Sequence, residues 1–209
     1  MKKALGIITI CLAFLSPVQA KTFNVVGTEV PPLMYSSDGQ AKGFYVDLLK
    51  AMTANLESTD VKIKFYPAKR MLHEISKNDD TFSLGITRNE KRETRYKWVG
   101  PIYPRIFALF KLKNRSDIQV KSLEDIRAYR IGVGRGYAAV NDLLEAGVPR
   151  KNIHEATDDT LNIKKLFRGR IDFVVMNDIM LAAQLKQQGK QWDDVEKALI
   201  LNDEYEFWY

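Results

Sequence analysis

Cysteine and histidine are nearly absent from this chain, and their scarcity excludes several kinds of chemistry. Cys11 is the single cysteine and lies inside an apolar stretch near the N-terminus. If that stretch is removed, no thiol remains for a disulfide framework, a nucleophile or a metal ligand. His73 and His154 are the only histidines, and they lack ligand-like spacing, which argues against metal catalysis. A Gly-x-Ser-x-Gly motif for a serine hydrolase is also absent.

Long apolar runs are lacking as well. The longest, residues 4–15, is shorter than the roughly 20 residues that a membrane-spanning helix needs. Two lysines precede this run, and Pro17 and the small Ala20 follow it, which is typical of a cleavable secretory signal. We therefore predict a signal peptide over residues 1–20, cleavage after Ala20, and an exported mature protein. A buried N-terminal helix is the alternative, and a lipoprotein is disfavoured because Cys11 precedes the cleavage point.

Concentrated positive charge is a third feature that the chain lacks. The formal net charge is +6, and it falls to +4 when the two lysines of the signal are removed. The basic residues are spread along the chain, whereas nucleic-acid binding needs a basic cluster with interleaved aromatics. The mild excess favours solubility and attracts anions. We therefore expect no nucleic-acid partner.

The hydrophobic pattern of the first half alternates between strands and helices. This order favours a parallel sheet flanked by helices. The predicted strands are residues 22–27, 61–65 and 82–86, and the predicted helices are residues 45–56 and a segment that begins at Pro67.

The alternation restarts after an extended segment that contains Trp98 and the apolar run 106–110. A short helix capped by Ser122 and Asp125 comes first. Two such units joined by an extended segment predict two lobes with a ligand cleft between them. The further strands are expected at 130–133, 152–156 and 171–175, and the helices at 137–146, 158–167 (capped by Asp158) and 178–188.

These patterns also place the lobe boundaries. Lobe 1 is expected over residues 21–104 and lobe 2 over residues 105–203. Residues 204–209 alternate like a strand and are expected to begin a return segment to lobe 1. The sequence stops there without a terminating helix, so we expect that a C-terminal part is missing.

Five short motifs follow one another in a specific order and spacing. They are GFYVDLL at 43–49, SLGITRNEKR at 83–92, WVGPIY at 98–103, RIGVGRG at 130–136 and GRIDFVV at 169–175. Together they resemble the periplasmic solute-binding proteins of polar amino-acid ABC importers, the bacterial extracellular solute-binding proteins of family 3. The resemblance implies a type II periplasmic binding protein fold: an α/β protein of two lobes, each a mainly parallel sheet flanked by helices, with a hinge of two crossing segments. It further implies a periplasmic monomer without cofactor or metal.

The resemblance assigns a ligand-binding role to residues that follow the third strand of lobe 1. Arg92 occupies the position of an arginine that grips a ligand carboxylate, and Thr87 that of a neighbouring hydroxyl. Gly85 occupies the position of a backbone carbonyl that receives a ligand amine. A guanidinium suits this role because its planar fork makes charge-assisted bonds to a carboxylate. Arg88 and Arg70 are further candidates for the same cleft, and the alternative for all three arginines is a solvated surface position.

In lobe 2 the resemblance points to two helix starts. Gly136 and Tyr137 link a strand to a helix whose free backbone N–H groups suit an oxyanion. Asn177 stands where the family has an amine-binding aspartate, and an amide lacks the charge that favours an ammonium. The adjacent Asp178 is a substitute, or only a carboxylate that stabilises the helix dipole. The change from aspartate to Asn177 therefore leaves open whether the ligand is an α-amino acid.

Aromatic residues near these positions are candidates for flat walls of the site. Tyr35, Trp98 and Tyr137 could stack on a ligand or exclude water, and structural packing is the alternative for each.

The implied function is the binding component of an ABC importer, which closes on a small anionic or zwitterionic solute and meets a membrane permease. The first alternative is an enzyme on the same scaffold, similar to cyclohexadienyl dehydratases. It would need a general acid, for which Glu29, Glu90 and Asp178 are candidates by position only. The second alternative is a sensor that presents its closed form to a membrane receptor.

Overall fold

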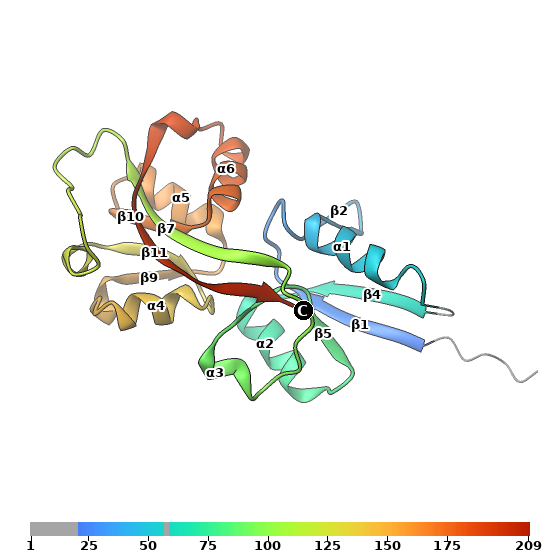
Figure 1. The fold of residues 1–209 in the computed structure, drawn as a ribbon. Helices are drawn as coiled ribbons and strands as arrows, with labels where there is room; N and C mark the ends of the chain where they lie inside the picture. Colours follow the sequence, from blue (N-terminus) through green and yellow to red (C-terminus); the bar gives the residue numbers. More distant parts are fainter. Residues whose placement is uncertain (1–20, 57–58) are drawn as a thin grey trace, which may run out of the picture.

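The computed structural model describes residues 21–56 and 59–209, and the predicted signal peptide lies outside the described residues. Two sheets of different size organise the chain (Figure 1), with a small hairpin beside them. The predicted α/β class and its two lobes are confirmed.

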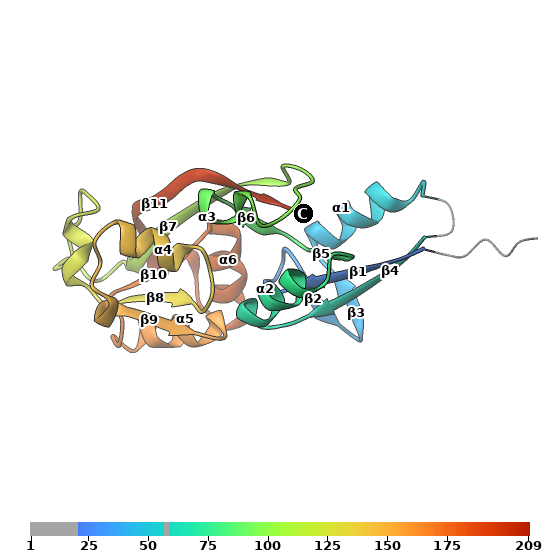
Figure 2. The ribbon, with the colours of Figure 1, turned by 90° about the horizontal axis from the view of Figure 1, so that it is seen from below.

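The first lobe is built on a parallel sheet with the strand order β4–β1–β5. Successive residues of a strand point to opposite faces, and the two helices of this lobe cover one face each (Figure 2). Val25 of β1 belongs to the cluster that includes Val46 of α1, whereas Val26 packs with Met71 of α2. The elements are β1 (Lys21–Gly27), the hairpin β2 (Tyr35–Ser37) and β3 (Gln40–Lys42), α1 (Phe44–Thr53), β4 (Thr59–Phe65), α2 (Ala68–Lys77) and β5 (Thr81–Ser83).

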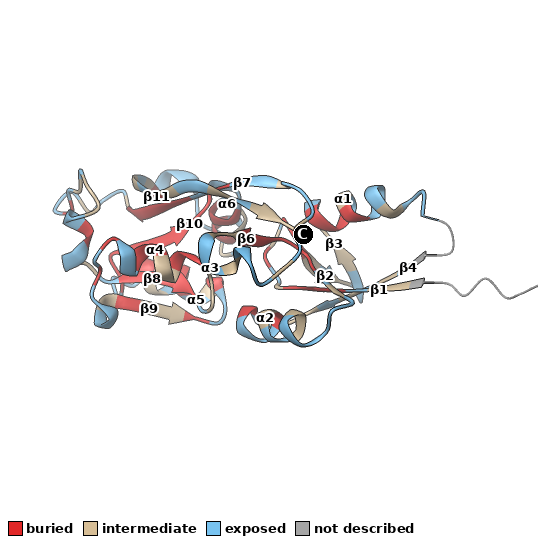
Figure 3. Cartoon of the chain, turned by 60° about the horizontal axis from the view of Figure 1, so that its bottom comes forward, coloured by how far each residue is buried: buried red, intermediate tan, exposed pale blue. Residues whose placement is uncertain are grey.

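The second lobe carries the larger sheet, whose strand order is β6–β11–β7–β10–β8–β9. Strands β8, β9 and β10 are parallel, and every residue of β8 and β10 is buried (Figure 3). Helix α4 lies on one face and α5 on the other, with α6 beside α5 (Figures 1 and 2). The elements are η1 (Asp125–Ala128), β8 (Ile131–Gly134), α4 (Ala139–Glu145), η2 (Arg150–Asn152), β9 (Ile153–Ala156), α5 (Asp159–Phe167), β10 (Phe173–Met176), α6 (Asp178–Gln187) and η3 (Trp192–Asp194).

Two long antiparallel strands, β7 (Tyr103–Leu112) and β11 (Val195–Trp208), connect the lobes. β7 leads into the second lobe, and β11 returns alongside it toward the first (Figure 1). At the end of β11, Tyr209 exchanges two backbone hydrogen bonds with Val99. Its hydroxyl donates to the backbone oxygen of Tyr45 at 2.7 Å. The two strands form the expected hinge.

The expected single strand over residues 82–86 was wrong. β5 ends at Ser83, and β6 (Ile86–Arg88) pairs with β11 in the other sheet. The chain turns at Gly85, whose φ of +77° favours glycine and where a Cβ atom would lie 2.6 Å from the ring of Tyr45. The strand therefore splits between the two sheets because only glycine fits the turn between its halves.

The observed helix starts of the second lobe agree in part with those predicted from the sequence. The predicted cap at Asp158 is confirmed, since its carboxylate accepts a hydrogen bond from the Thr160 amide at 2.8 Å. Helix α4 begins later than predicted, at Ala139. The predicted short helix after Ser122 is one 3₁₀ turn, and the carboxylate of Asp125 accepts from the Ser122 amide at 3.0 Å.

Candidate functional site

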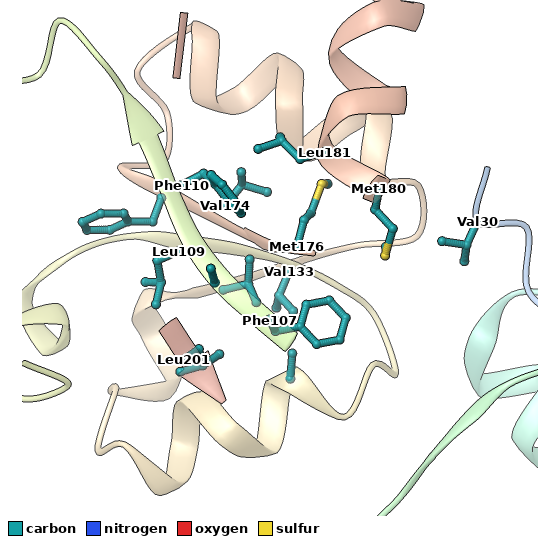
Figure 4. Close-up of a cluster of buried hydrophobic side chains, with 14 of the residues drawn as sticks. Val30, Phe107, Leu109, Phe110, Val133, Val174, Met176, Met180, Leu181 and Leu201 are labelled. Atoms are coloured by element: carbon teal, nitrogen blue, oxygen red, sulfur yellow. The ribbon is translucent and has the colours of Figure 1, made fainter. Parts of the chain in front are cut away.

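A cavity of about 70 Å³ lies where the two lobes meet. Its walls come from the end of β1, α1, α2 and the β5–β6 turn of one side, and from β7, the β8–α4 loop and α6 of the other. In Figure 4, Val30 of the first lobe lies across from Met180 of α6 and Phe107 of β7. The lining residues are Thr28, Val30, Leu33, Met34, Tyr45, Ala68, Met71, Leu72, Gly85, Ile86, Thr87, Arg92, Phe107, Gly136, Tyr137, Ala138, Met180 and Phe207.

Five of the predicted ligand-binding residues line this cavity. Three of them come from the first-lobe segment after β5: Gly85 in the β5–β6 turn, Thr87 in β6 and Arg92 in the short helix α3 (Glu90–Glu93). The other two, Gly136 and Tyr137, come from the β8–α4 loop of the second lobe. The fold thus brings together residues that are more than forty positions apart in the sequence.

Arg92 is the one charged residue among the described residues that line the cavity. Its Nη1 donates to the backbone oxygen of Thr87 at 3.1 Å, which orients the guanidinium. None of the described carboxylates lies within ion-pair distance of it. Burial lowers the pKa of Arg92 below its ordinary value because it disfavours the charged form, although an arginine stays protonated. The site therefore holds a partly desolvated positive charge without a counter-ion.

Two hydroxyl groups in the cavity wall were not identified from the sequence. Thr28 and Tyr45 both line the cavity, and their side-chain oxygens are buried without a hydrogen-bond partner. Burial raises the pKa of the Tyr45 phenol well above its ordinary value, so the hydroxyl keeps its proton. A sequence signal existed for Thr28, which directly follows a parallel strand at the edge where ligands bind.

Tyr137 is held in place by a buried carboxyl group. Its hydroxyl donates to Oδ2 of Asp159 at 3.0 Å. Its ring lies so close to Gly134 that a Cβ atom there would be 2.5 Å away. Burial raises the pKa of Asp159 to about 6. The ring of Tyr137 is therefore held in place in the cavity wall, and its hydroxyl is bonded to Asp159.

The other predicted cations of lobe 1 are engaged outside the cavity. Arg88 forms an ion pair with Glu93 at 2.5 Å and lies over the ring of Trp208. Arg70 lies 3.6 Å from Glu74 and over the ring of Tyr66. Neither arginine lines the cavity.

Two predicted aromatic residues also lie elsewhere. The indole nitrogen of Trp98 donates to the backbone oxygen of Glu93 at 3.2 Å, and its ring contacts Tyr96 edge to face. Tyr35 pairs with Lys42 in the β2–β3 hairpin. Neither ring lines the cavity.

Asn177 and Asp178 stand at the start of α6 and face other partners. Oδ1 of Asn177 accepts the Met180 amide at 2.7 Å and caps the helix. Asp178 forms an ion pair with Lys197 of β11 at 2.7 Å. Met180, one turn into the helix, lines the cavity in their place.

A buried ion pair lies close behind the cavity. Arg105 of β7 is fully buried and bonds to the carboxylate of Asp142 on α4 and to Oδ1 of Asn202. Burial raises the pKa of Asp142, and the charge of Arg105 opposes that rise. The carboxylate of Asp142 is thus already committed to a cation of its own lobe.

Neither a metal cluster nor a membrane span is found in the part of the chain that the structure describes. No group of three or more His, Cys, Asp or Glu side chains there could hold a metal ion. No helix there is long and apolar enough to cross a membrane.

Comparisons with known proteins agree with this architecture. The family model of bacterial extracellular solute-binding proteins, family 3, matches residues 24–199. An ancestral arginine-binding protein bound to arginine has a TM-score of 0.71 at 22% identity, with 90% of this chain and 83% of that chain covered. EhuB in complex with hydroxyectoine has a TM-score of 0.76 at 21% identity, with coverages of 89% and 74%. A histidine kinase sensor domain with similarity to periplasmic binding proteins has a TM-score of 0.77 at 18% identity, with coverages of 90% and 82%. No curated protein sequence gives a match.

Proposed function

The chain belongs to family 3 of the bacterial extracellular solute-binding proteins, and we propose that it captures a small anionic or zwitterionic solute and delivers it to an ABC importer. The solute binds between the lobes, and the closed form is what the membrane permease recognises. Solved proteins of similar fold are bound to arginine or to hydroxyectoine, which are small solutes.

The observation that carries the proposal is the guanidinium of Arg92 in the cavity between the lobes. It is half-buried and partly desolvated, it has no carboxylate partner among the described residues, and the carbonyl of Thr87 orients it. A partly desolvated charge without a partner is unfavourable, so the site gains most from an anion that arrives as a ligand. A carboxylate matches the planar fork in geometry and charge.

Closure follows from the position of the cavity. A ligand bound to Arg92 and Thr87 touches the first lobe, and Gly136, Tyr137 and Met180 of the second lobe complete the wall. A ligand shifts such an equilibrium by the extra contacts that it makes in the closed form. The hinge strands β7 and β11 are the elements about which this motion takes place.

The proposed location is the periplasm, reached through the signal over residues 1–20. The proposed lobes are residues 21–104 and 105–203, with the return to the first lobe from residue 204. The pairing of Glu206 with Arg88, Phe207 with Thr87 and Trp208 with Ile86 supports that return. We propose a monomer with the permease as its protein partner.

A sensor role is the second candidate, because a histidine kinase sensor domain shares this fold. In that case the closed form would be read by a receptor. Ligand uptake by cells that lack the gene distinguishes the two: loss of uptake supports the importer, and intact uptake with a lost transcriptional response supports the sensor.

Catalysis on this scaffold has less support. Glu29, Glu90 and Asp178 were the candidate general acids, and none of them lines the cavity. Glu29 accepts the amide of Ser36 at 3.2 Å in the exposed loop. The described lining offers no carboxyl or imidazole group for proton transfer, which supports a binding role. Incubation with prephenate or arogenate, with assay for product, tests the dehydratase alternative.

The test of the proposed function is a ligand screen followed by paired arginine variants. A thermal-shift screen over amino acids, dicarboxylates and opines identifies ligands, because binding to the native state raises the melting temperature. Calorimetry with the best ligand should show a loss of affinity of about 100-fold or more for Arg92→Ala, since the substitution removes a charge-assisted contact that the bound ligand shields from water. The matched control is Arg95→Ala, an exposed arginine of the same segment. Equal affinities of both variants and the parent would refute the role of Arg92.

A further inference from the structure

We infer that the cavity selects a monocarboxylate that carries no ammonium group and has a mostly apolar body. The inference rests on the proposed function and narrows it, because a zwitterionic amino acid satisfies the general proposal and not this one. Three features of the described lining carry it: its net charge, the engagement of the nearby carboxylates, and the chemistry of its remaining wall.

The net charge of the lining favours one negative charge on the ligand. Arg92 is the one ionised group among the described lining residues. A bound monocarboxylate brings the closed cavity to electrical neutrality. An α-amino acid brings an ammonium as well and leaves one uncompensated positive charge, which is unfavourable away from water. A dicarboxylate leaves an uncompensated negative charge.

No described carboxylate lines the cavity, and three polar side chains that could have received an ammonium are engaged elsewhere. Asp142 is bonded to Arg105, and Asp178 is bonded to Lys197. Asn177 is uncharged, and its only acceptor oxygen bonds to the backbone of its own helix. None of the three lines the cavity. Neutral acceptors such as backbone carbonyls accept hydrogen bonds from an ammonium without cancelling its charge.

Asp159 is a further carboxyl group that could be considered for an ammonium, but it bonds to the Tyr137 hydroxyl. It stands behind Tyr137, whose hydroxyl occupies Oδ2 at 3.0 Å, and it does not line the cavity. Burial also raises its pKa, so part of its charge is lost near neutral pH. It supports the aromatic wall and does not present a charge to the ligand.

The remaining wall suits an apolar body with one further oxygen. Most of it is aliphatic, thioether and aromatic, and these surfaces gain from burying a hydrocarbon chain. The hydroxyls of Thr28 and Tyr45 lack partners in the protein. A buried polar group without a partner is unfavourable, so a keto or hydroxyl oxygen beside the carboxylate would satisfy one or both. The apolar residues are Val30, Leu33, Met34, Ala68, Met71, Leu72, Ile86, Phe107, Ala138, Met180 and Phe207.

Matched pairs of probes test the inference directly. The full chain is expressed with its own leader, and the exported protein is titrated calorimetrically with leucine, 4-methyl-2-oxopentanoate and 4-methylpentanoate. A shorter pair, 2-aminobutanoate and 2-oxobutanoate, covers a smaller body. We expect each amine-free acid to bind at least about tenfold more tightly than its amino acid, which corresponds to about 1.4 kcal/mol of binding free energy.

The outcomes separate this inference from the proposed function. Tighter binding of the amino acids would overturn the inference and leave the proposed function standing. Absence of binding by all five probes would overturn the inference, and the proposed function would fall only if the wider thermal-shift screen also found no ligand. Binding of the oxo acids that is insensitive to Arg92→Ala would also overturn the inference, because the charge balance would then play no part.

Hydroxyl deletions provide a second measurement. Thr28→Val and Tyr45→Phe remove an unpartnered hydroxyl and keep the shape of the wall. We expect the melting temperature of the free protein to stay the same or rise, and the affinity for 4-methyl-2-oxopentanoate to fall about tenfold in at least one variant. Tyr129→Phe, a half-buried tyrosine away from the cavity, is the matched control. Unchanged affinity in both variants would overturn the assignment of these hydroxyls to the ligand.

Discussion

Gly136 of the second lobe lies directly against Lys69 at the start of α2 in the first lobe. A Cβ atom at residue 136 would lie 2.9 Å from Cγ and 3.1 Å from the backbone nitrogen of Lys69. The φ of Gly136 is +82°, a conformation that side chains other than glycine rarely adopt. The two lobes thus approach each other at backbone distance beside the cavity, and there is no room for a side chain between them.

Gly136→Ala should therefore impair closure more than it impairs folding. We expect ligand affinity to fall at least about tenfold, because the closed form has to separate at this contact to admit the methyl group. Calorimetry and small-angle scattering with and without ligand measure the two effects. Gly189→Ala is the control, since its φ of +64° is also positive but nothing lies within 4 Å of an added Cβ atom. If the two variants bind equally well, the contact with Lys69 does not limit closure.

Lys91 and Glu145 form an ion pair of 2.7 Å between α3 and α4, at the rim of the same junction. Both side chains are more than half exposed, at 61% and 58%. Exposed pairs contribute little and are screened by salt. We expect Lys91→Ala to weaken ligand binding about two- to fivefold at low salt and hardly at all at high salt. The charge-reversed pair Lys91→Glu with Glu145→Lys should restore the affinity. If it does not, the ion pair between α3 and α4 does not stabilise the ligand-bound form.

Gly85→Ala should be strongly destabilising. The substitution places a methyl group 2.6 Å from the ring of Tyr45 and requires a φ of +77° from alanine. The backbone term alone costs about 1 kcal/mol, and Tyr45 is fully buried and cannot move aside. Urea unfolding should show a loss clearly larger than that of Gly39→Ala, a control whose φ is +74° in open space. Equal losses would mean that the Tyr45 contact is not limiting.

Asp159 makes the stability of the protein depend on pH. Burial raises its pKa from the ordinary 3.8 to about 6, so the folded state binds the proton more tightly than the unfolded chain does. The ionised carboxylate therefore lowers the free energy of unfolding above pH 6, and this penalty disappears as the pH falls from 6 toward 4. At pH 7 the penalty is about 3 kcal/mol.

Asp159→Asn should remove this dependence. We expect the variant to be more stable than the parent at pH 7 by about 2–3 kcal/mol, and by less than about 1 kcal/mol at pH 4. Urea unfolding of both proteins from pH 4 to pH 7 measures the difference in their free energies of unfolding. The contributions of the other titrating groups cancel in this difference. A difference that stays constant with pH would contradict the raised pKa.

Much of the fold could be predicted from the sequence because it depends on local periodicity. The strands β1, β4, β8 and β10 and the helices between them follow from apolar spacing, and the cap at Asp158 follows from its own side chain. The split of residues 82–86 between two sheets was not predictable, since it depends on Tyr45, forty residues earlier. The long pairing of β11 with β7 likewise joins strands about ninety residues apart.

The candidate site divides in the same way. The motif positions of Arg92, Thr87, Gly85, Gly136 and Tyr137 were predictable, and these residues line one cavity. Arg88 and Arg70 carry the same charge as Arg92, yet their neighbours Glu93 and Glu74 engage them outside the cavity. The residue type is identical in all three cases, so the sequence alone did not separate them.

The sequence by itself determined most of the strands and helices, and it placed Arg88 and Arg92 together after the third predicted strand. Only the tertiary structure decided which charges are neutralised, which hydroxyls are left without a partner, and that Asn177 caps a helix. The physical reason is range. Backbone conformation responds to residues a few positions away, whereas desolvation and ion pairing depend on side chains that the fold brings together from distant parts of the chain.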